Sequence, residues 1–407
     1  MNETNDIAVV LGTRPEIIKL AGVIRGLGPR ASIFYTGQHY DRELSDSFFH
    51  AFKLPEPHVR LTGVSAAHRS VQIARATQQL AEHFRQLPPK VVIVQGDTNA
   101  TSAGAQAANY CGIPVLHVEA GLRSNDRTMP EEINRRLVSV LADVHCAPTS
   151  WNAANLVSEG IPLHRIRVTG NTIVEATRES MPGPLETREL LDRYGLRENE
   201  FIIATIHRPE NTDSPERLSE IIDALADAPI PVVFPVHPRT VSSAHSYGLA
   251  GTLSRLRCIS PLDHSAFLSL ASSARLLISD SGGIQEECTI IKKPLIVVRK
   301  NTERPESIAA GFAVRVRHKE EISEEITRIL LNPDLVSALA GRPCPFGDGK
   351  ASERIAEIAL AMAGRTALPY SEAGDEFSST PEPIGPQGGA VGRALRRSPV
   401  QQGSIGQ

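Results

Sequence analysis

Charged and polar residues stand directly after several short apolar runs of the chain. Asp97 and Glu119 follow two successive runs, and His207 and Asp280 follow two others further along. In open parallel sheets, ligands bind beyond the carboxyl ends of the strands, so we expect these side chains to meet at a site. One polar residue after one strand is usually a helix cap, but its repetition in both halves of the chain favours a site.

Asp97, Glu119 and Glu131 form the group best suited to proton transfer. Burial and like charge separate the pKa values of neighbouring carboxylates, so one can hold a proton while another accepts one. Taken singly, Glu131 and Glu132 are typical of a helix start, where the macrodipole favours acidic residues. His207, followed by Arg-Pro-Glu-Asn, is a further catalytic candidate, although a lone His is more often structural.

The best anion site predicted from the sequence is DSGGIQEE at 280–287. A strand ends there, Gly282 and Gly283 let a backbone come close, and a helix begins whose free N–H groups suit a diphosphate. Glu287 would then accept hydrogen bonds from ribose hydroxyls, whereas the plain alternative is an ordinary turn with Ser281 as N-cap. Because the stretch matches neither GxGxxG nor the P-loop pattern, NAD and ATP chemistry gain no support.

A second cationic wall is predicted at the start of the first helix. Gly12-Thr13-Arg14-Pro15-Glu16 places a proline where helices accept it. Arg14 and Lys19 would converge on the same anion from the opposite side of the cleft. The alternative is a capped and solvated helix start.

Two series of strands and helices must position these residues. Apolar, β-branched runs alternate with helical stretches, which is typical of parallel α/β folds. The series are joined near 170–200, so we expect two Rossmann-like domains with parallel sheets facing across a deep cleft. The predicted strands are Ile7–Leu11, Ala31–Tyr35, Val91–Gln95, Pro114–Val118, Val144–Ala147, Ile166–Val168, Phe201–Ile206, Pro231–Val236, Arg257–Ser260, Leu276–Ser279 and Leu295–Val298.

Length and composition agree with two domains. The chain has 407 residues, 41% of them hydrophobic and 22% charged, and we assign 1–170 and 171–350 to the domains and 368–407 to a disordered tail. A formal net charge of −3 gives no basic field for nucleic acid or an acidic membrane. Scattered cysteines, no visible signal peptide and no membrane-spanning run lead us to expect a cytoplasmic protein without disulfides or a metal site.

A set of motifs from about residue 7 to 315 resembles the UDP-N-acetylglucosamine 2-epimerases in order and spacing. This resemblance implies a GT-B-like fold, with a last helix at about 351–367 packed back on the N-terminal domain. It also implies reversible conversion of UDP-GlcNAc to UDP-ManNAc without a metal or nicotinamide cofactor, in a homodimer formed through the N-terminal domains. The motifs are GTRPEIIK (12–19), TGQH (36–39), GDT (96–98), HVEAGLRS (117–124), PEEINR (130–135), VTGN (168–171), HRPEN (207–211), DSGGIQEE (280–287) and TERPE (302–306).

Carried over motif by motif, the resemblance makes Asp97, Glu119 and Glu131 the acid and base groups. His207 would assist the departing diphosphate, and Glu287 would bind the ribose. The other residues expected to bind the UDP-sugar are Arg14, Lys19, Arg208, His237, Leu262, Phe267, Ser281, Gly282, Gly283 and Arg304.

Two departures from the family pattern leave alternatives open. The segment from Glu119 to Pro130 is shorter than in many bacterial members, and is closer to a branch that acts on modified UDP-sugars. In members activated by a second UDP-GlcNAc, a Gln shortly after Gln38 is expected, but Asp41 stands there, although Arg69 falls near the expected activator contact. A hydrolysing epimerase, an epimerase of a modified UDP-HexNAc, a GT-B glycosyltransferase and a nucleotide-sugar sensor are the alternatives.

Overall fold

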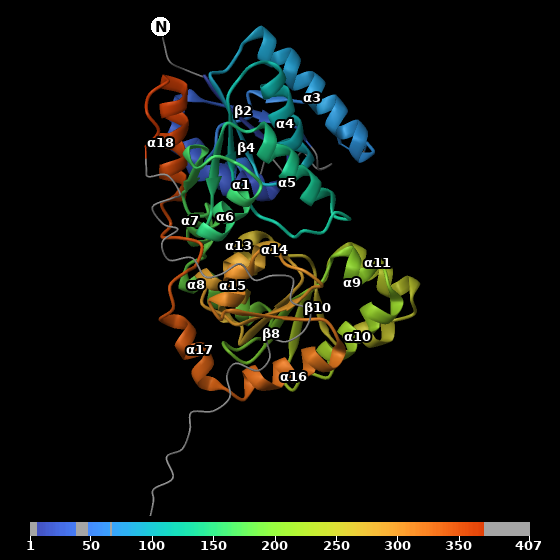
Figure 1. Ribbon diagram of the computed structural model, residues 1–407. Coiled ribbons are helices and arrows are strands. Elements are labelled where there is room, and N and C mark those ends of the chain that lie inside the picture. Colours follow the sequence, from blue (N-terminus) through green and yellow to red (C-terminus); the bar gives the residue numbers. More distant parts are fainter. Residues whose placement is uncertain (1–5, 38–47, 66, 370–407) are drawn as a thin grey trace, which may run out of the picture.

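The computed structural model describes residues 6–37, 48–65 and 67–369, which fold into two halves stacked on one another (Figure 1). Each half contains one parallel β-sheet with helices on both faces. The predicted α/β class is therefore confirmed. The tail from 370 and Gln38 lie outside the described residues, and the domain boundaries at 170 and 350 stay a prediction.

The N-terminal half is built on a seven-stranded sheet in the order β3-β2-β1-β4-β5-β6-β7. The chain runs outward from β1 to β3 and then returns to place β4 beside β1, in parallel. A ligand crevice is expected where the strand order reverses, which here is between the ends of β1 and β4. The strands are β1 (Ile7–Leu11), β2 (Ala31–Tyr35), β3 (Val59–Arg60), β4 (Val91–Gln95), β5 (Val115–Val118), β6 (Val144–Ala147) and β7 (Ile166–Val168).

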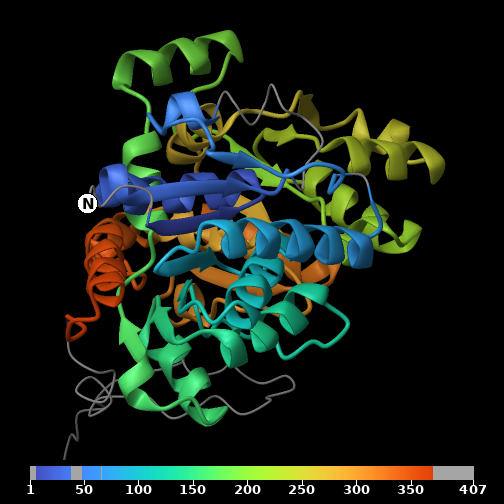
Figure 2. The ribbon, with the colours of Figure 1, turned by 90° about the horizontal axis from the view of Figure 1, so that it is seen from above.

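Alternate residues of β1 serve two separate cores, because successive side chains of a strand point to opposite faces. Ile7, Val9 and Leu11 pack with α1 and α18, whereas Ala8 and Val10 pack with α3 and α4. Figure 2 views this half of the molecule from above. Helix α18 comes from the end of the described chain and lies against α1. The helices of this half are α1 (Arg14–Leu27), α3 (Arg69–Gln86), α4 (Asn99–Tyr110), α5 (Pro130–Leu141), α6 (Ser150–Ser158) and α18 (Ala351–Gly364). Helix α7 (Ile173–Ser180) contacts helices of both halves.

The C-terminal half repeats this plan with a six-stranded sheet in the order β10-β9-β8-β11-β12-β13. Its strand order reverses between β8 and β11, so the second expected crevice lies at their ends. The strands are β8 (Ile202–Thr205), β9 (Val232–Pro235), β10 (Arg257–Ile259), β11 (Leu276–Ser279), β12 (Leu295–Val298) and β13 (Ala313–Val316).

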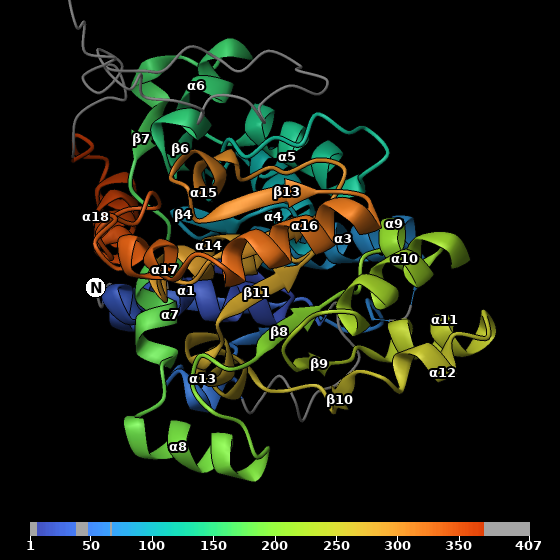
Figure 3. The same ribbon diagram turned by 90° about the horizontal axis from the view of Figure 1, so that it is seen from below.

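Helices again cover both faces of this second sheet (Figure 3). Ile202 and Ala204 pack in the core that includes α10 and α16, and Ile203 packs in the core on the other face with α13 and α14. The helices are α8 (Pro184–Arg193), α9 (Pro209–Thr212), α10 (Pro215–Ala226), α11 (Pro238–Ser246), α12 (Ala250–Leu253), α13 (His264–Ser273), α14 (Gly282–Ile290), α15 (Pro305–Ala309), α16 (Lys319–Leu330) and α17 (Pro333–Ala340).

The structure adds elements that the sequence pattern did not predict. Strands β3 and β13 lie at sheet edges and carry half-buried or mixed residues, so they lack the continuous apolar run used to find the others. The joining stretch near 170–200 contains helices α7 and α8. Within the described part of the chain, no helix is long and apolar enough to cross a membrane.

Candidate active site

The two halves meet through alternating buried charges contributed by both of them. Lys19 Nζ, on α1, lies 2.6 Å from Glu119 Oε2 and 3.1 Å from Glu286 Oε2 of α14. Arg304, just before α15, lies 2.7 Å from Glu286 and 3.4 Å from Glu119. Lys19 and Glu119, both predicted as site residues, thus form ion pairs with Glu286 and Arg304 of the C-terminal half.

The environments of Glu119 and Glu286 separate their pKa values. Burial is the main reason that the pKa of Glu119 is raised; Lys19 opposes this shift, and the neighbouring charge of Glu286 adds to it. Burial also acts on Glu286, but Arg304 and Lys19 outweigh it and lower the pKa of that carboxyl. The pKa of Glu119 therefore lies above that of Glu286, which makes Glu119 the more readily protonated carboxyl of the pair.

The backbone at Glu119 is held in a left-handed conformation with φ of 61°. This region is unfavourable for a residue with a side chain by about 1–3 kcal/mol, and such residues gather at functional sites. The side chain is fixed by Gln95 of β4, whose Nε2 donates a 2.6 Å hydrogen bond to it. Gly121 follows at φ 89°, where a Cβ would lie 2.2 Å from the carbonyl oxygen of Asn152, so only glycine fits this turn.

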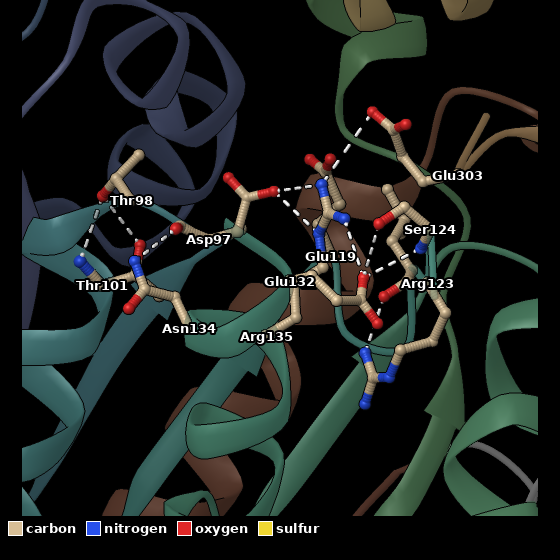
Figure 4. A network of polar contacts seen from close by, with 12 residues as sticks. Asp97, Thr98, Thr101, Glu119, Arg123, Ser124, Glu132, Asn134, Arg135 and Glu303 are labelled. Atoms are coloured by element: carbon tan, nitrogen blue, oxygen red, sulfur yellow. Dashed lines mark hydrogen bonds and ion pairs between the residues drawn. The ribbon is translucent and has the colours of Figure 1, made fainter. Parts of the chain in front are cut away.

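Asp97 follows β4 and is bonded by Arg135 of α5 (Figure 4). Arg135 Nε and Nη2 lie 2.8 Å and 2.5 Å from Asp97 Oδ2, and the same guanidinium lies 3.9 Å from Glu303 of the other half. The Asp97 side chain is 27% exposed. It is thus an oriented carboxylate that keeps access to solvent at the boundary of the halves.

Glu131 and Glu132, adjacent on α5, have different surroundings. Glu132 is fully buried, accepts hydrogen bonds from Ser124, and lies 3.2 Å from Arg135 and Arg136. Glu131 is half-buried and, in the described part of the chain, has neither a hydrogen bond nor an ion pair on its side chain. Glu132 therefore serves the structure, and Glu131 remains available for chemistry.

His207 lies at the end of β8, beside Asp280 at the end of the neighbouring β11. Its Nδ1 is 3.3 Å from Asp280 Oδ1. Burial lowers the pKa of His207 by more than Asp280 raises it. The exposed His237, which caps α11 by accepting from Arg239 N at 3.2 Å, has its ring 5.9 Å from that of His207.

The start of α14 has the features predicted for an anion site. Ser281 occupies the N-cap position, but its side chain makes no capping hydrogen bond, which leaves free N–H groups there. The two glycines differ: a Cβ on Gly282 would lie 2.6 Å from Arg304 Nη1, whereas a Cβ on Gly283 would meet only Ser281 Oγ at 3.9 Å. Gly282 is thus needed for the packing of Arg304, and Gly283 keeps the helix start open.

Arg14 differs from the other predicted cations of the site. Lys19 and Arg304 are buried among carboxylates, and Arg208 lies 3.8 Å from Glu303. Arg14 is half-buried with its guanidinium 5.6 Å from the centre of the Phe48 ring, and no carboxylate of residues 6–37, 48–65 and 67–369 pairs with it. Its charge is therefore the one most available to an incoming anion.

The remaining predicted residues lie around this centre or away from it. Glu287 is buried and 2.8 Å from His264 Nε2. Leu262 and Phe267 are half-buried, packed against a core of the C-terminal half. Arg69 is exposed at the start of α3, where it lines a surface hollow with His68, Ser70 and Ile73.

Comparison with known proteins assigns the chain to a family. A family model described as UDP-N-acetylglucosamine 2-epimerase matches residues 28–360. The chain belongs to this epimerase family. The UDP-N-acetylglucosamine 2-epimerase of Methanocaldococcus jannaschii is 37% identical over 364 residues, which cover 86% of this chain and 98% of that protein.

Solved structures agree with this assignment. The crystal structure of the Methanocaldococcus jannaschii epimerase in complex with UDP-GlcNAc and UDP has a TM-score of 0.78 at 36% identity, covering 87% of this chain and 99% of that one. The epimerase of Neisseria meningitidis bound to UDP-GlcNAc has a TM-score of 0.79 at 32% identity, with coverage of 87% and 99%. The GT-B-like fold expected for an epimerase of this family is therefore confirmed.

The sequence motifs of this epimerase contain further site residues whose roles were not predicted from the sequence. Glu286, Glu303 and Arg135 stand inside DSGGIQEE, TERPE and PEEINR, yet each links the two halves or orients a predicted acid. Glu303 is buried, and Arg304, Arg299 and Arg135 outweigh that burial and lower the pKa of its carboxyl. The many charged residues of these motifs were visible in the sequence, but the sequence did not show which of them would pair.

Proposed function

We propose that this protein interconverts UDP-GlcNAc and UDP-ManNAc without net hydrolysis. The C2 proton of the sugar is not acidic, because no carbonyl stands beside it. A base therefore removes this proton as the C1–O bond breaks: the C–H electron pair forms the C1=C2 bond of 2-acetamidoglucal, and UDP leaves with the pair of the C1–O bond. UDP then adds back to C1, and an acid protonates C2 from the opposite face.

Asp97, Glu119 and Glu131 supply the acid and base groups. Inversion at C2 needs a proton-transfer group on each face, and neighbouring carboxylates also stabilise positive character at C1. The raised pKa of Glu119, which results mainly from burial, suits a group that donates a proton. The oriented Asp97 and the unpaired Glu131 suit groups that accept one.

The departing diphosphate is stabilised by Arg14, His207 and the start of α14 with Ser281 and Gly283. Negative charge that grows in the transition state is best met by fixed donors and cations. Lys19 and Arg304 already lie among carboxylates, so their main task is to hold Glu119 and join the halves. The remaining contacts fall to Glu287 for the ribose, Leu262 and Phe267 for the uracil, and Arg208, His237 and Gly282 for the walls of the site.

The observation that supports this proposal best is the shared charge cluster of Lys19, Glu119, Glu286 and Arg304. Its members come from the segments that follow β1, β5, β11 and β12, so a nucleotide diphosphate held by one half would present its sugar to the carboxylates of the other. Relatives whose names and structures refer to UDP-GlcNAc support the choice of substrate.

The test is incubation with UDP-GlcNAc in D₂O, followed by NMR of C2 and of the products. We expect deuterium at C2 and formation of UDP-ManNAc. Free ManNAc with UDP would identify a hydrolysing enzyme instead. No exchange with UDP-GlcNAc but exchange with a modified UDP-HexNAc would identify another epimerase, and no exchange with any UDP-sugar would overturn the proposal and leave a glycosyltransferase or a sensor.

We also propose a homodimer formed through the N-terminal halves. Helix α5 exposes an apolar stripe of Ile133, Leu137 and Val140 at helical spacing, and Val140 is 73% exposed. An exposed apolar stripe on a surface helix marks a contact surface. The cytoplasmic location and the absence of a cofactor remain predictions from the sequence.

A further inference from the structure

A fully buried carboxylate lies behind His207 at the switch point of the C-terminal sheet. Asp280 is 0% exposed and follows β11. Because Ser279 pairs with Thr205 of the adjacent β8, the residues after the two strands come level with one another. Asp280 Oδ1 thereby lies 3.3 Å from His207 Nδ1.

The other contacts of Asp280 fix it to the segment that carries His207. The backbone N–H of His207 donates to its oxygens at 3.2 Å and 3.0 Å, and that of Arg208 at 2.9 Å. The side-chain amide of Asn211 donates at 3.0 Å, and also reaches the Val298 carbonyl at 2.9 Å. These donors include the backbone of His207 itself and its neighbour Arg208. They therefore hold the Asp280 carboxylate close to Nδ1 of the His207 ring.

We propose that Asp280 is the positioning residue for His207. It keeps the ring in the tautomer with hydrogen on Nδ1, leaves Nε2 on the side away from Asp280, and stabilises the imidazolium that assists the departure of UDP. This proposal rests on the role of His207 in the proposed function. Because Asp280 is completely buried, its effect on the reaction passes through His207.

Asp280 is the one charged neighbour that favours protonation of this ring among the groups acting on it in the described chain. Arg208 beside it, His237 before α11 and Arg239 on α11 all oppose a positive charge on His207. Burial opposes it most strongly, and the pKa of His207 is lowered as a result. Without the charge of Asp280, none of these neighbouring groups would raise the pKa of His207.

The sign of the pH effect follows from this arrangement. The imidazolium is present below the pKa of His207 and is lost as the pH rises through it. Neutralising Asp280 lowers this pKa further, so the alkaline loss of turnover shifts to lower pH. An opposite charge a few ångströms away changes a pKa by about 1–3 units, which is the expected size of the shift.

The direct test is ¹⁵N NMR of the full-length protein with labelled histidines. His207→Asn assigns the signal, and titrations compare the wild type with Asp280→Asn and with the control Asp227→Asn, which removes an exposed carboxylate paired with Arg255 and Lys319. We expect a lower His207 pKa in Asp280→Asn alone, with the alkaline limb of kcat displaced in parallel. An unchanged pKa, or an unchanged pH profile of kcat, overturns the proposal.

A measurement on the wild type covers the case in which Asp280→Asn does not fold. The ¹⁵N shifts of the neutral ring report its tautomer, and hydrogen on Nε2 would overturn the proposal, whereas hydrogen on Nδ1 supports it. C2 exchange by the wild type tests the proposed function separately. A protein with the expected tautomer and pKa coupling but no C2 exchange would refute the function and not the coupling of the two residues.

Discussion

Lys19 and Glu286 meet across the boundary between the halves, with Lys19 Nζ 3.1 Å from the carboxylate. Both side chains are almost completely buried, and each also bonds to a residue of the opposite charge. Burial alone would lower the pKa of Lys19, but Glu119 and Glu286 outweigh it and raise that pKa. The ammonium therefore stays charged, and the contact depends on both carboxylates.

Glu286→Gln is expected to destabilise the protein. Removing one partner leaves Lys19 and Arg304 buried with less compensation, and breaking a buried pair in this way costs about 3–5 kcal/mol. The measurement is urea unfolding at neutral pH. Glu200→Gln, which alters an exposed ion pair with Arg197, serves as the control and should change little. Equal midpoints for the two variants would contradict the structural role of Glu286.

Asp97→Asn and Glu131→Gln are expected to reduce turnover while UDP binding survives. Each removes a proton-transfer group but keeps the size of the side chain, so the loss should reach about 10²-fold or more. Deuterium incorporation at C2 measures the loss, and calorimetry with UDP measures binding. Asp192→Asn, on the exposed face of α8, is the matched control. Rates like those of the wild type in either variant would remove that residue from the mechanism.

Residues after buried strands were predictable, because a run of four or five apolar residues can be recognised as a buried strand without other information. β1 and β4 were located in this way, and with them Arg14 and Asp97. The contact of Lys19 with Glu286 was not predictable, since 267 positions separate them and no periodicity relates the halves. Sequence spacing places a side chain within one βα unit, but it does not show which charge from the other sheet will face it.

For the same reason, the sequence did not show that the cations predicted to bind the diphosphate differ in their availability to a ligand. Arg14, Lys19 and Arg304 look alike in the sequence, as cations of the motifs GTRPEIIK and TERPE. Only folding shows that the latter two are buried among Glu119 and Glu286. A cation is available to a ligand only where tertiary contacts do not already pair it with carboxylates. Such contacts form only when the two halves come together.

Arg14→Gln is therefore expected to weaken UDP binding with little effect on stability. A charged hydrogen bond to phosphate contributes about 1.5–3 kcal/mol, so the affinity should fall by about 10-fold or more. Calorimetry with UDP measures this loss. Arg193→Gln, at the exposed end of α8, is the control for a lost surface charge. Arg304→Gln should differ from Arg14→Gln by lowering the unfolding midpoint as well, and the same result for both would refute the distinction.

Glu substitutions at Leu137 and Val140 are expected to separate the proposed dimer. Two charges on the apolar stripe of α5 would have to be desolvated in an interface, which is unfavourable without partners. Light scattering after size-exclusion chromatography measures the molar mass. Leu331→Glu replaces a side chain that is 78% exposed in the other half, and should leave the mass unchanged. A wild type of monomer mass would refute the dimer, and a dimer that persists in the double variant would place its interface elsewhere.

The buried pair His117 and His145 predicts how stability depends on pH. The two residues face each other on β5 and β6, and burial lowers the pKa of His117 to about 4 and that of His145 to about 3, from 6.5. The folded state thus excludes protons that the unfolded chain binds below pH 6.5. The free energy of unfolding is highest above that pH, and falls by about 1.4 kcal/mol per pH unit for each histidine as the pH drops toward these values.

His145→Phe is expected to weaken this acid sensitivity. Neither ring nitrogen of His145 has a hydrogen-bond partner among the described residues, so an apolar ring removes a proton-binding site without breaking a bond. Urea unfolding at pH 7.5 and pH 5 should show a smaller difference in midpoint for the variant than for the wild type. His164→Phe, in the turn before β7, is the control, since that side chain is exposed. An undiminished loss of stability at pH 5 in His145→Phe would show that other groups cause the acid sensitivity.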